Sequence, residues 1–375
     1  MLRSVSTLAL VFTSLITARP AADAKPSGPV TIDHDNPLIF YHGRWTNEPS
    51  SWWAGTGIKL YVEDLQSLTL NIGEATTAPF AAAGLSIDYA PFVTVNISTG
   101  ANVLPIPAST AVKGGGKKTS VVRISTEEGY DNRIQIDSLV LNAGAKLLPY
   151  EPSKLHFQFI GDSLTAGYLD PQGVVDSWAF LIGESFKAEN NINAMSGICL
   201  TDQYCYSNNR GLSFEYFRTE DTAYYYTTDH NYTTPWNFKK DLTPTHIWIT
   251  IGANDAAYDI TDSAFEEVYA IFLANLRKLY PTQPIFINQP WAWPLSDGTF
   301  GYFYQGVYQT VVANRNAAGD KHVYYIDMTG WLDYDDVYPD NLHPTPEGHI
   351  KVAAKMAAWL ENWGLKPLAN WATLP

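Results

Sequence analysis

The chain changes its pattern of hydrophobic and polar positions near residue 150. Before this point, apolar and polar residues alternate at Ser67–Ile72, Thr94–Ser98, Val121–Thr126 and Asn132–Val140. Turn-forming clusters separate these runs, as at the glycine-rich segment Lys113–Lys118. A period of two predicts strands with one buried face, and no long amphipathic helical pattern interrupts them. The first part of the chain therefore predicts an antiparallel β-sandwich.

Beyond Pro149–Ser153, short apolar runs alternate with helical patterns. The runs predict buried strands at His156–Ile160, Asn193–Met195, His246–Ile251, Pro284–Asn288 and His322–Asp327. Strands that alternate with helices favour an α/β domain whose parallel sheet is covered on both faces. In such sheets, binding sites lie at the carboxyl ends of the strands.

Two of the predicted helices carry clear start signals. Ser263–Tyr280 opens with a capping box made by its serine and Glu266. Pro346–Trp363 has Thr345 placed as N-cap and proline at its first position. Between the second and third predicted strands, Thr201–Leu242 lacks a clear period, which is typical of a functional or poorly ordered loop.

Length and charge narrow the classes of protein. A chain of 375 residues suits two domains, which we place at residues 25–152 and 153–375. Hydrophobic residues make up 46% and charged residues 17%, which is a globular composition. The net charge of −14, without any basic cluster, excludes a nucleic-acid partner and disfavours an acidic membrane surface. We expect a monomer that acts on a neutral or mildly polar substrate.

The first 24 residues have the pattern of a secretory signal peptide. Arg3 supplies the positive charge, and Leu8–Ile16 is apolar but too short to span a bilayer. Cleavage fits after Ala24, in a small-x-small pattern, or after Ala18. We therefore expect a secreted, extracellular protein.

Export affects how the cysteines and two asparagines are interpreted. In an oxidising route we expect Cys199 and Cys205 to form a disulfide; the alternative is two buried free thiols. Asn96 and Asn231 each begin an Asn-x-Ser/Thr tripeptide and are candidate glycosylation sites.

The strongest chemical signal is Gly161-Asp162-Ser163-Leu164, directly after the first strand of the α/β domain. A serine hydroxyl is a weak nucleophile unless a base removes its proton. A tight strand-to-helix turn, which Gly161 permits, exposes the oxygen of Ser163 above the sheet. Ser163 is therefore the candidate nucleophile.

Three further motifs follow in order: Ser196-Gly197, Gly252-Ala253-Asn254-Asp255, and Asp340-Asn341-Leu342-His343. Together with the first motif they resemble the four blocks of the SGNH, or GDSL, hydrolase superfamily, over roughly residues 155–363. The resemblance implies a three-layer, flavodoxin-like α/β fold.

The resemblance also implies a role for each matching residue. Ser163 would be the nucleophile, His343 its base and Asp340 the acid that orients the histidine. The backbone N–H groups of Ser163 and Gly197 and the amide of Asn254 would form the oxyanion hole. These roles suit ester cleavage, which passes through a tetrahedral oxyanion that fixed donors stabilise. Asp162 and Asp255 are better interpreted as structural hydrogen-bonding groups.

No pattern for a metal or another cofactor occurs in the sequence. His349 follows His343 by six residues, which matches no common ligand spacing, and there is no HExxH motif or cysteine cluster. His156 and His246 lie inside predicted strands. We therefore expect an enzyme without a cofactor.

The N-terminal half carries a second resemblance. Gly43-Arg44-Trp45, Trp53–Ile58, Leu68–Ile72 and Asp137–Leu147 resemble the jelly-roll domain of family two carbohydrate esterases. Those enzymes join a β-sandwich to an SGNH domain and remove acetyl groups from plant polysaccharides. The resemblance implies an acetyl esterase acting on an acetylated polysaccharide or oligosaccharide, such as xylan or glucomannan.

Two alternatives to this function stay open. The same fold serves lipid and aryl esterases, although the sequence has no amphipathic lid helix. A non-catalytic, secreted glycan-binding protein is the other alternative. Trp291 and Trp293 follow the strand Pro284–Asn288, so we expect one or both to stack on a sugar ring at the catalytic edge.

Overall fold

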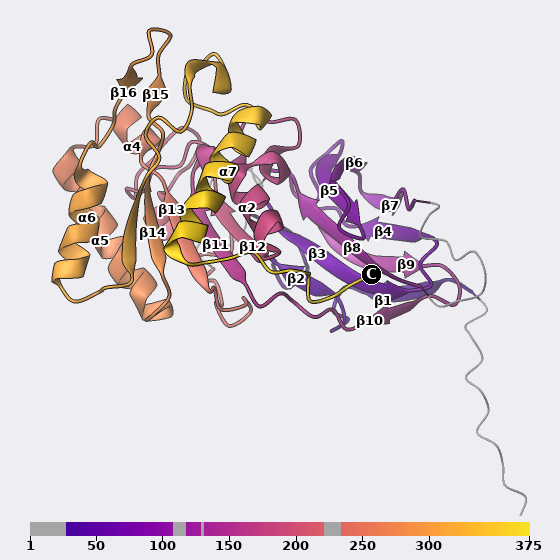
Figure 1. Cartoon of the computed structure of the whole chain (residues 1–375). Helices are drawn as coiled ribbons and strands as arrows, with labels where there is room; N and C mark the ends of the chain where they lie inside the picture. The colour runs from indigo at the N-terminus through magenta and orange to yellow at the C-terminus, as the bar shows by residue number, and fades with distance from the viewer. Residues whose placement is uncertain (1–27, 108–117, 129–130, 221–233) are drawn as a thin grey trace, which may run out of the picture.

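A computed structural model describes residues 28–107, 118–128, 131–220 and 234–375. The predicted signal peptide, the glycine-rich segment before Lys118 and the tripeptide at Asn231 lie outside the described residues. Antiparallel sheets and a parallel sheet occupy opposite ends of the molecule (Figure 1).

The N-terminal part is built from two antiparallel sheets. The first has the order β1 (Val30–Asp33), β9 (Ile136–Leu141), β4 (Leu68–Ile72), β7 (Gly100–Val103). The second has the order β10 (Lys146–Leu148), β3 (Gly57–Glu63), β8 (Thr119–Thr126), β5 (Ala81–Ile87), β6 (Val93–Ile97), with β2 (Phe40–His42) paired to β3. Alternate residues of β4 are buried, as the period of two predicts. The predicted β-sandwich is confirmed.

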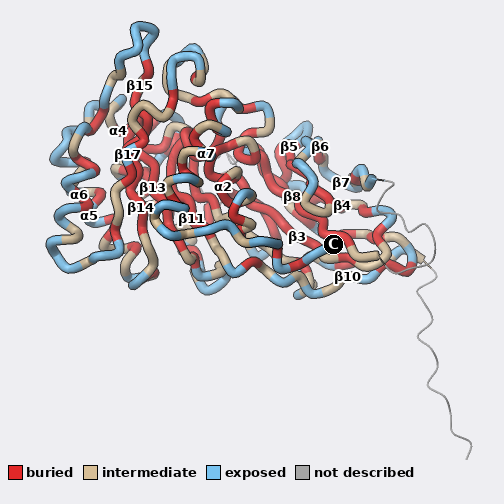
Figure 2. Tube along the Cα trace, in the orientation of Figure 1, coloured by how far each residue is buried: buried red, intermediate tan, exposed pale blue. Residues whose placement is uncertain are grey.

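The C-terminal part holds a five-stranded sheet in which every neighbouring pair is parallel. Its order is β12 (Glu189–Ala194), β11 (His156–Gly161), β13 (His246–Thr250), β14 (Ile285–Gln289), β17 (Val323–Asp327). All residues of β13 and β14 are buried, because helices cover both faces (Figure 2). The predicted α/β fold is confirmed.

The helices form two groups on either side of this sheet (Figure 1). One group pairs α2 (Trp178–Phe186) with α7 (Pro346–Trp363), and the other pairs α5 (Asp262–Leu279) with α6 (Val307–Ala317). Shorter pieces are α1 (Ser163–Ala166), α3 (Leu212–Glu215), α4 (Ala253–Ala257) and the 3-10 turns η2 (Gly173–Asp176) and η3 (Tyr334–Asp336). A two-stranded hairpin of β15 (Trp293–Pro294) and β16 (Phe300–Gly301) completes the domain.

Two predicted boundaries need correction. The second parallel strand runs over Glu189–Ala194 and not Asn193–Met195, because the polar stretch at its start pairs with β11 from His156 onward. Helix α5 is capped by Thr261, whose side chain accepts the N–H of Ala264, so the predicted capping box at Ser263 is wrong. The predicted N-cap of α7, Thr345, is confirmed.

The two parts of the chain pack closely against each other. The jelly-roll motif supplies much of this contact: Arg44 is fully buried and donates to the carbonyl of Arg218 at 2.6 Å, and Trp53 Nε1 donates to the carbonyl of Thr219 at 3.1 Å. The C-terminal tail returns to the sandwich, where Trp371 stacks on Tyr89 with ring centroids 4.6 Å apart (Figure 1).

Candidate active site

The turn after β11 places Ser163 at the carboxyl edge of the parallel sheet. A side chain at Gly161 would come within 2.3 Å of Thr165 Oγ1 and 2.6 Å of the Thr250 carbonyl, so only glycine fits there. Asp162 then caps α1 by accepting the N–H of Leu164 at 3.0 Å. Because the helix begins at Ser163, the serine hydroxyl is held at the start of the helix, and the residue as a whole is 6% exposed.

His343 reaches Ser163 from a segment 180 residues further along the chain. Its Nε2 lies 2.7 Å from Ser163 Oγ, and its Nδ1 lies 2.5 Å from Asp340 Oδ2. Nδ1 carries the proton in this arrangement, so Nε2 is left to accept from the serine. The structure thus brings together the serine, the histidine and the acid that the sequence singled out.

The Asp340 carboxylate also organises the backbone of its own loop. Its Oδ1 accepts the N–H groups of Leu342 and His343, each at 3.0 Å. Partial burial acts to raise the pKa of Asp340, but hydrogen bonds from the His343 ring and these two amides outweigh it and lower the pKa below its ordinary value. The carboxylate therefore stays ionised near neutral pH, and it can stabilise an imidazolium.

Gly197 and Asn254 line the same cavity as Ser163 and His343. Gly197 has φ +78°, a conformation that favours glycine, and it follows the carboxyl end of β12. Asn254 Nδ2 donates one hydrogen bond to the carbonyl of Ile198 at 2.9 Å. This bond orients the amide, and the second N–H of Nδ2 is available for an oxyanion.

The aspartates next to the nucleophile and next to Asn254 have hydrogen-bonding roles in the fold. Asp162 caps α1, and burial together with the neighbouring Asp255 carboxylate raises the pKa of Asp162 to about 7, against the N–H of Leu164 that lowers it. Asp255 accepts the N–H groups of Leu200 and Thr201 at 2.7 and 2.9 Å. Neither carboxylate lines the cavity.

The cavity has a volume of about 430 Å³ and is edged by aromatic side chains. Trp293 lines it from β15. Tyr168 is 44% exposed, and its ring lies edge-on to the His343 ring with centroids 5.0 Å apart. Tyr206 also lines the cavity and is 51% exposed.

Trp291 does not line this cavity, so its predicted contact with a sugar is wrong. The side chain is 0% exposed, and its Nε1 donates to the carbonyl of Leu342 at 2.9 Å. Trp291 therefore supports the catalytic loop from the core, and Trp293 alone of the two tryptophans reaches the cavity.

Neither Tyr168 nor Tyr206 belongs to a motif that the sequence marks as functional. Tyr168 stands five residues after Ser163 and lies outside the four motifs. Tyr206 directly follows Cys205, so the predicted disulfide was the one signal that pointed to its neighbourhood. The disulfide itself is confirmed: Cys199 and Cys205 are bonded, with both residues buried.

His349, the histidine that follows His343 in the sequence, is fully buried. Its Nδ1 accepts the N–H of Trp178 at 3.0 Å, and its Nε2 lies 3.1 Å from Asp170 Oδ2. Across residues 28–107, 118–128, 131–220 and 234–375, no group of three or more acidic, histidine or cysteine side chains is placed to hold a metal ion. No helix among the same residues is long and apolar enough to cross a membrane.

A serine, a histidine and an acid in hydrogen-bonding sequence at the carboxyl edge of a parallel sheet define a serine hydrolase. Residues 159–350 match the profile of the GDSL-like Lipase/Acylhydrolase family. This span covers more than half of the chain, and the chain belongs to that family. The protein is therefore a carboxylic ester hydrolase, as the four motifs predict.

Solved structures with both domains share the fold. A family two carbohydrate esterase from Clostridium thermocellum, in complex with cellohexaose, aligns with a TM-score of 0.69 at 21% identity, over 87% of this chain and 98% of that one. An acetyl xylan esterase from Butyrivibrio proteoclasticus aligns with a TM-score of 0.69 at 15% identity, over 89% and 98%. A family two carbohydrate esterase from Corynascus thermopiles, with a carbohydrate binding domain, aligns with a TM-score of 0.66 at 20% identity, over 86% and 99%.

These alignments cover nearly the whole length of each solved chain. The expected likeness to family two carbohydrate esterases is thereby confirmed for the fold. No protein with a curated function is detectably similar in sequence.

Proposed function

We propose that the protein is a secreted acetyl esterase that removes acetyl groups from O-acetylated plant polysaccharides such as xylan or glucomannan. The observation that carries this proposal is the hydrogen-bonded row of Ser163, His343 and Asp340 at the base of an open cavity edged by aromatic rings. Ester hydrolysis needs this serine–histidine–aspartate triad, and aromatic rings at the edge of the cavity suit the apolar faces of a sugar chain.

In the proposed course, His343 Nε2 takes the proton of Ser163 while the oxygen attacks the acetyl carbonyl. The resulting oxyanion receives the N–H groups of Ser163 and Gly197 and the free N–H of Asn254. The imidazolium, stabilised by Asp340, then protonates the departing sugar oxygen. Water attacks the acetyl-Ser163 ester in the same way and releases acetate.

The solved structures of similar fold support the choice of substrate. One is described as an acetyl xylan esterase, and another holds cellohexaose. The cavity agrees with a glycan, because Trp293 and Tyr168 present aromatic surface beside the catalytic histidine.

Three features support secretion. The signal-peptide pattern lies at the N-terminus, the chain has a disulfide, and Asn96 is exposed on β6 in a glycosylation tripeptide. Asn231, the second candidate, lies outside the described residues. The measurement is the N-terminal sequence and mass of protein collected from the medium of an expressing eukaryotic culture. We expect a start after Ala24 or Ala18 and added glycan mass that is lost on Asn96→Gln.

The activity is tested by acetate release from acetylated xylan, acetylated glucomannan and long-chain acyl esters. We expect release from at least one acetylated glycan, with kcat lowered about 10⁴-fold or more in Ser163→Ala and the melting temperature unchanged. Hydrolysis of long-chain esters alone would identify a lipid esterase instead.

Covalent labelling separates an esterase from a non-catalytic glycan-binding protein. An organophosphonate should add its mass to the native protein and to Ser207→Ala, whose serine lines the same cavity, but not to Ser163→Ala. A native protein that stays unlabelled and inactive would contradict the mechanism.

A further inference from the structure

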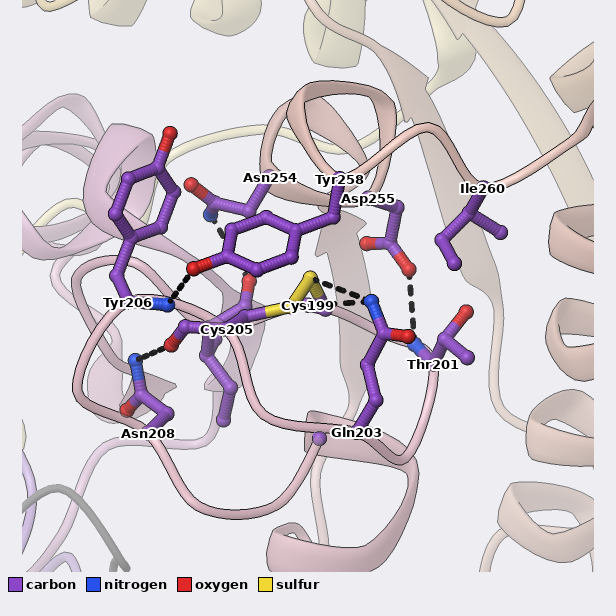
Figure 3. The surroundings of a disulfide bond; sticks show 12 residues. Cys199, Thr201, Gln203, Cys205, Tyr206, Asn208, Asn254, Asp255, Tyr258 and Ile260 are labelled. Carbon is purple, nitrogen blue, oxygen red and sulfur yellow. Dashed lines mark hydrogen bonds between the residues drawn. A yellow bond between two sulfur atoms is a disulfide. The ribbon is translucent and has the colours of Figure 1, made fainter.

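A short loop closed by the disulfide lies directly beside the expected oxyanion hole (Figure 3). Cys199 and Cys205 are buried, with their Cα atoms 5.9 Å apart, and Gly197 precedes the first of them by two residues. The disulfide loop therefore begins two residues after the glycine whose backbone N–H is expected to stabilise the oxyanion.

Helix α4 holds this loop along its backbone. Asn254 donates to the carbonyl of Ile198, and the Asp255 carboxylate accepts the next two available amides, those of Leu200 and Thr201 (Figure 3). On the other side, Asn208 Nδ2 donates to the carbonyl of Ser196 at 3.0 Å. The loop is thus fixed to the same helix that carries the oxyanion amide.

The loop presents Tyr206 to the cavity in a restrained conformation. Its φ is +39°, in the left-handed region that non-glycine residues seldom adopt. Its N–H donates to the hydroxyl of Tyr258 at 2.6 Å, and the two rings meet edge-on with centroids 5.2 Å apart. Tyr258 and the disulfide together hold Tyr206 in a backbone conformation that an unconstrained loop would seldom adopt.

The ring of Tyr206 lies next to the catalytic groups. It lines the cavity with Ser163 and Asn254, and a Cβ placed on Gly197 would lie 2.9 Å from its own Cβ. Tyr206 is 51% exposed, and its hydroxyl makes no hydrogen bond within the described part of the chain. An aromatic surface and an unused hydroxyl therefore face the space that a substrate enters.

We propose that Tyr206 is a specificity-determining residue that contacts the sugar ring carrying the ester. This inference rests on the proposed function. An aromatic face suits the apolar face of a sugar, and the hydroxyl suits the sugar's own hydroxyl groups. The acetyl group needs little space, and the small side chains Ala253 and Ala257 line the cavity on the same helix as Asn254.

Four variants test this contact. Tyr206→Ala removes the ring and the hydroxyl, and Tyr206→Phe removes the hydroxyl alone. Tyr258→Phe keeps its ring but removes the oxygen that accepts the Tyr206 N–H. Tyr204→Ala is the matched control, because Tyr204 lies in the same loop and is 58% exposed but does not line the cavity.

Each variant is assayed on acetylated oligosaccharides from xylan and glucomannan, on ethyl acetate, whose alcohol has no ring, and on ethyl esters of longer acids. The deacetylated oligosaccharide is also measured as an inhibitor of ethyl acetate hydrolysis. For Tyr206→Ala we expect KM for the glycan and the inhibition constant to rise about fivefold, and kcat/KM to fall clearly more for the glycan than for ethyl acetate. Tyr206→Phe and Tyr258→Phe should give smaller rises, and Tyr204→Ala none.

The outcomes distinguish the two proposals. If the native enzyme cleaves ethyl acetate but neither hydrolyses nor binds any of the glycans, the proposed function fails and the Tyr206 contact fails with it. If the native enzyme acts on the glycan and Tyr206→Ala leaves KM and the inhibition constant unchanged, only the contact is wrong. Equal losses on both substrates would make Tyr206 a structural support of the oxyanion hole, and faster cleavage of longer acyl esters would place it on the acyl side; either result overturns the inference.

Discussion

Single residues of this site owe their position to backbone groups more than to other side chains. Asn254 shows this best. One N–H of its side-chain amide donates to the Ile198 carbonyl, and because the amide is planar, this bond also fixes the direction of the second N–H. Asp340 likewise binds the amides of Leu342 and His343 as well as the imidazole. Such contacts place the reacting groups before the substrate arrives, and preorganisation of this kind contributes much of enzymatic rate enhancement.

The proposed role of Asn254 leads to a prediction at this scale. Asn254→Ala removes one oxyanion donor and should lower kcat about 10²–10³-fold with little change in KM, because the bond forms mainly in the transition state. Steady-state kinetics on an acetylated substrate measure this. A kcat within threefold of native would remove Asn254 from the oxyanion hole.

At the scale of elements, the loop between β12 and α3 depends on its disulfide. Replacing both Cys199 and Cys205 by alanine should lower the free energy of unfolding by about 2 kcal/mol, because the unfolded chain regains the entropy of a short loop. The turnover number should also fall, since the Gly197 amide loses its brace. Thermal melting and kinetics, with Tyr204→Ala as control, test this; unchanged stability and activity would refute the brace.

Helix α7 places a buried histidine close to a buried carboxyl group in the segment after α1. His349 on α7 lies 3.1 Å from Asp170, and burial, with Asp176 nearby, raises the pKa of Asp170 to about 8. A raised carboxyl pKa means that the folded protein holds a proton that the unfolded chain releases above its ordinary value of 3.8. The contribution of Asp170 to the free energy of unfolding therefore falls as pH rises from about 4 to about 8.

Asp170→Asn should remove that dependence. Relative to the native protein, the variant should gain in free energy of unfolding between pH 4 and pH 8. Urea unfolding at three pH values across this window measures the difference. A difference that does not vary with pH would show that Asp170 is ionised in both states.

At the scale of the whole molecule, a buried ion pair joins the two domains. Lys59 Nζ on β3 lies 2.5 Å from Glu189 Oε2 on β12, and both side chains are almost fully buried. Glu189 also accepts the hydroxyl of Tyr150 and the N–H of Ser153, both in the segment that connects the domains. This carboxylate therefore links sandwich, connector and parallel sheet.

Breaking this pair should destabilise the protein strongly. Lys59→Met leaves the Glu189 carboxylate buried without its cation and should lower the free energy of unfolding by about 3–5 kcal/mol. Adding Glu189→Gln should recover most of the loss, because the uncompensated charge disappears. Chemical denaturation of the single and double variants tests this; an equal loss in both would mean that packing, and not charge, holds the interface.

Local signals in the sequence predicted the elements that local interactions specify. The cap of α7 depends on Thr345 and its next residues alone, and it was found. At α5 two hydroxyl residues on either side of Asp262 compete for one cap. Thr261 takes it in place of Ser263, so the helix begins at Asp262, two residues earlier than a cap at Ser263 would allow. The start of β12 was missed because polar residues there are paired with β11 and not marked by an apolar run.

The sequence by itself determined the two-part architecture, the disulfide partners and the order of the four motifs, because alternation, turns and short motifs are set by neighbouring residues. Only the tertiary structure decided that Ser163 and His343, 180 residues apart, meet at 2.7 Å. It also buried Trp291 while leaving Trp293 at the cavity, and it placed Tyr168 and Tyr206 beside the catalytic groups. Which side chain faces a cavity depends on the packing of elements that are distant in the chain, and no local pattern encodes that.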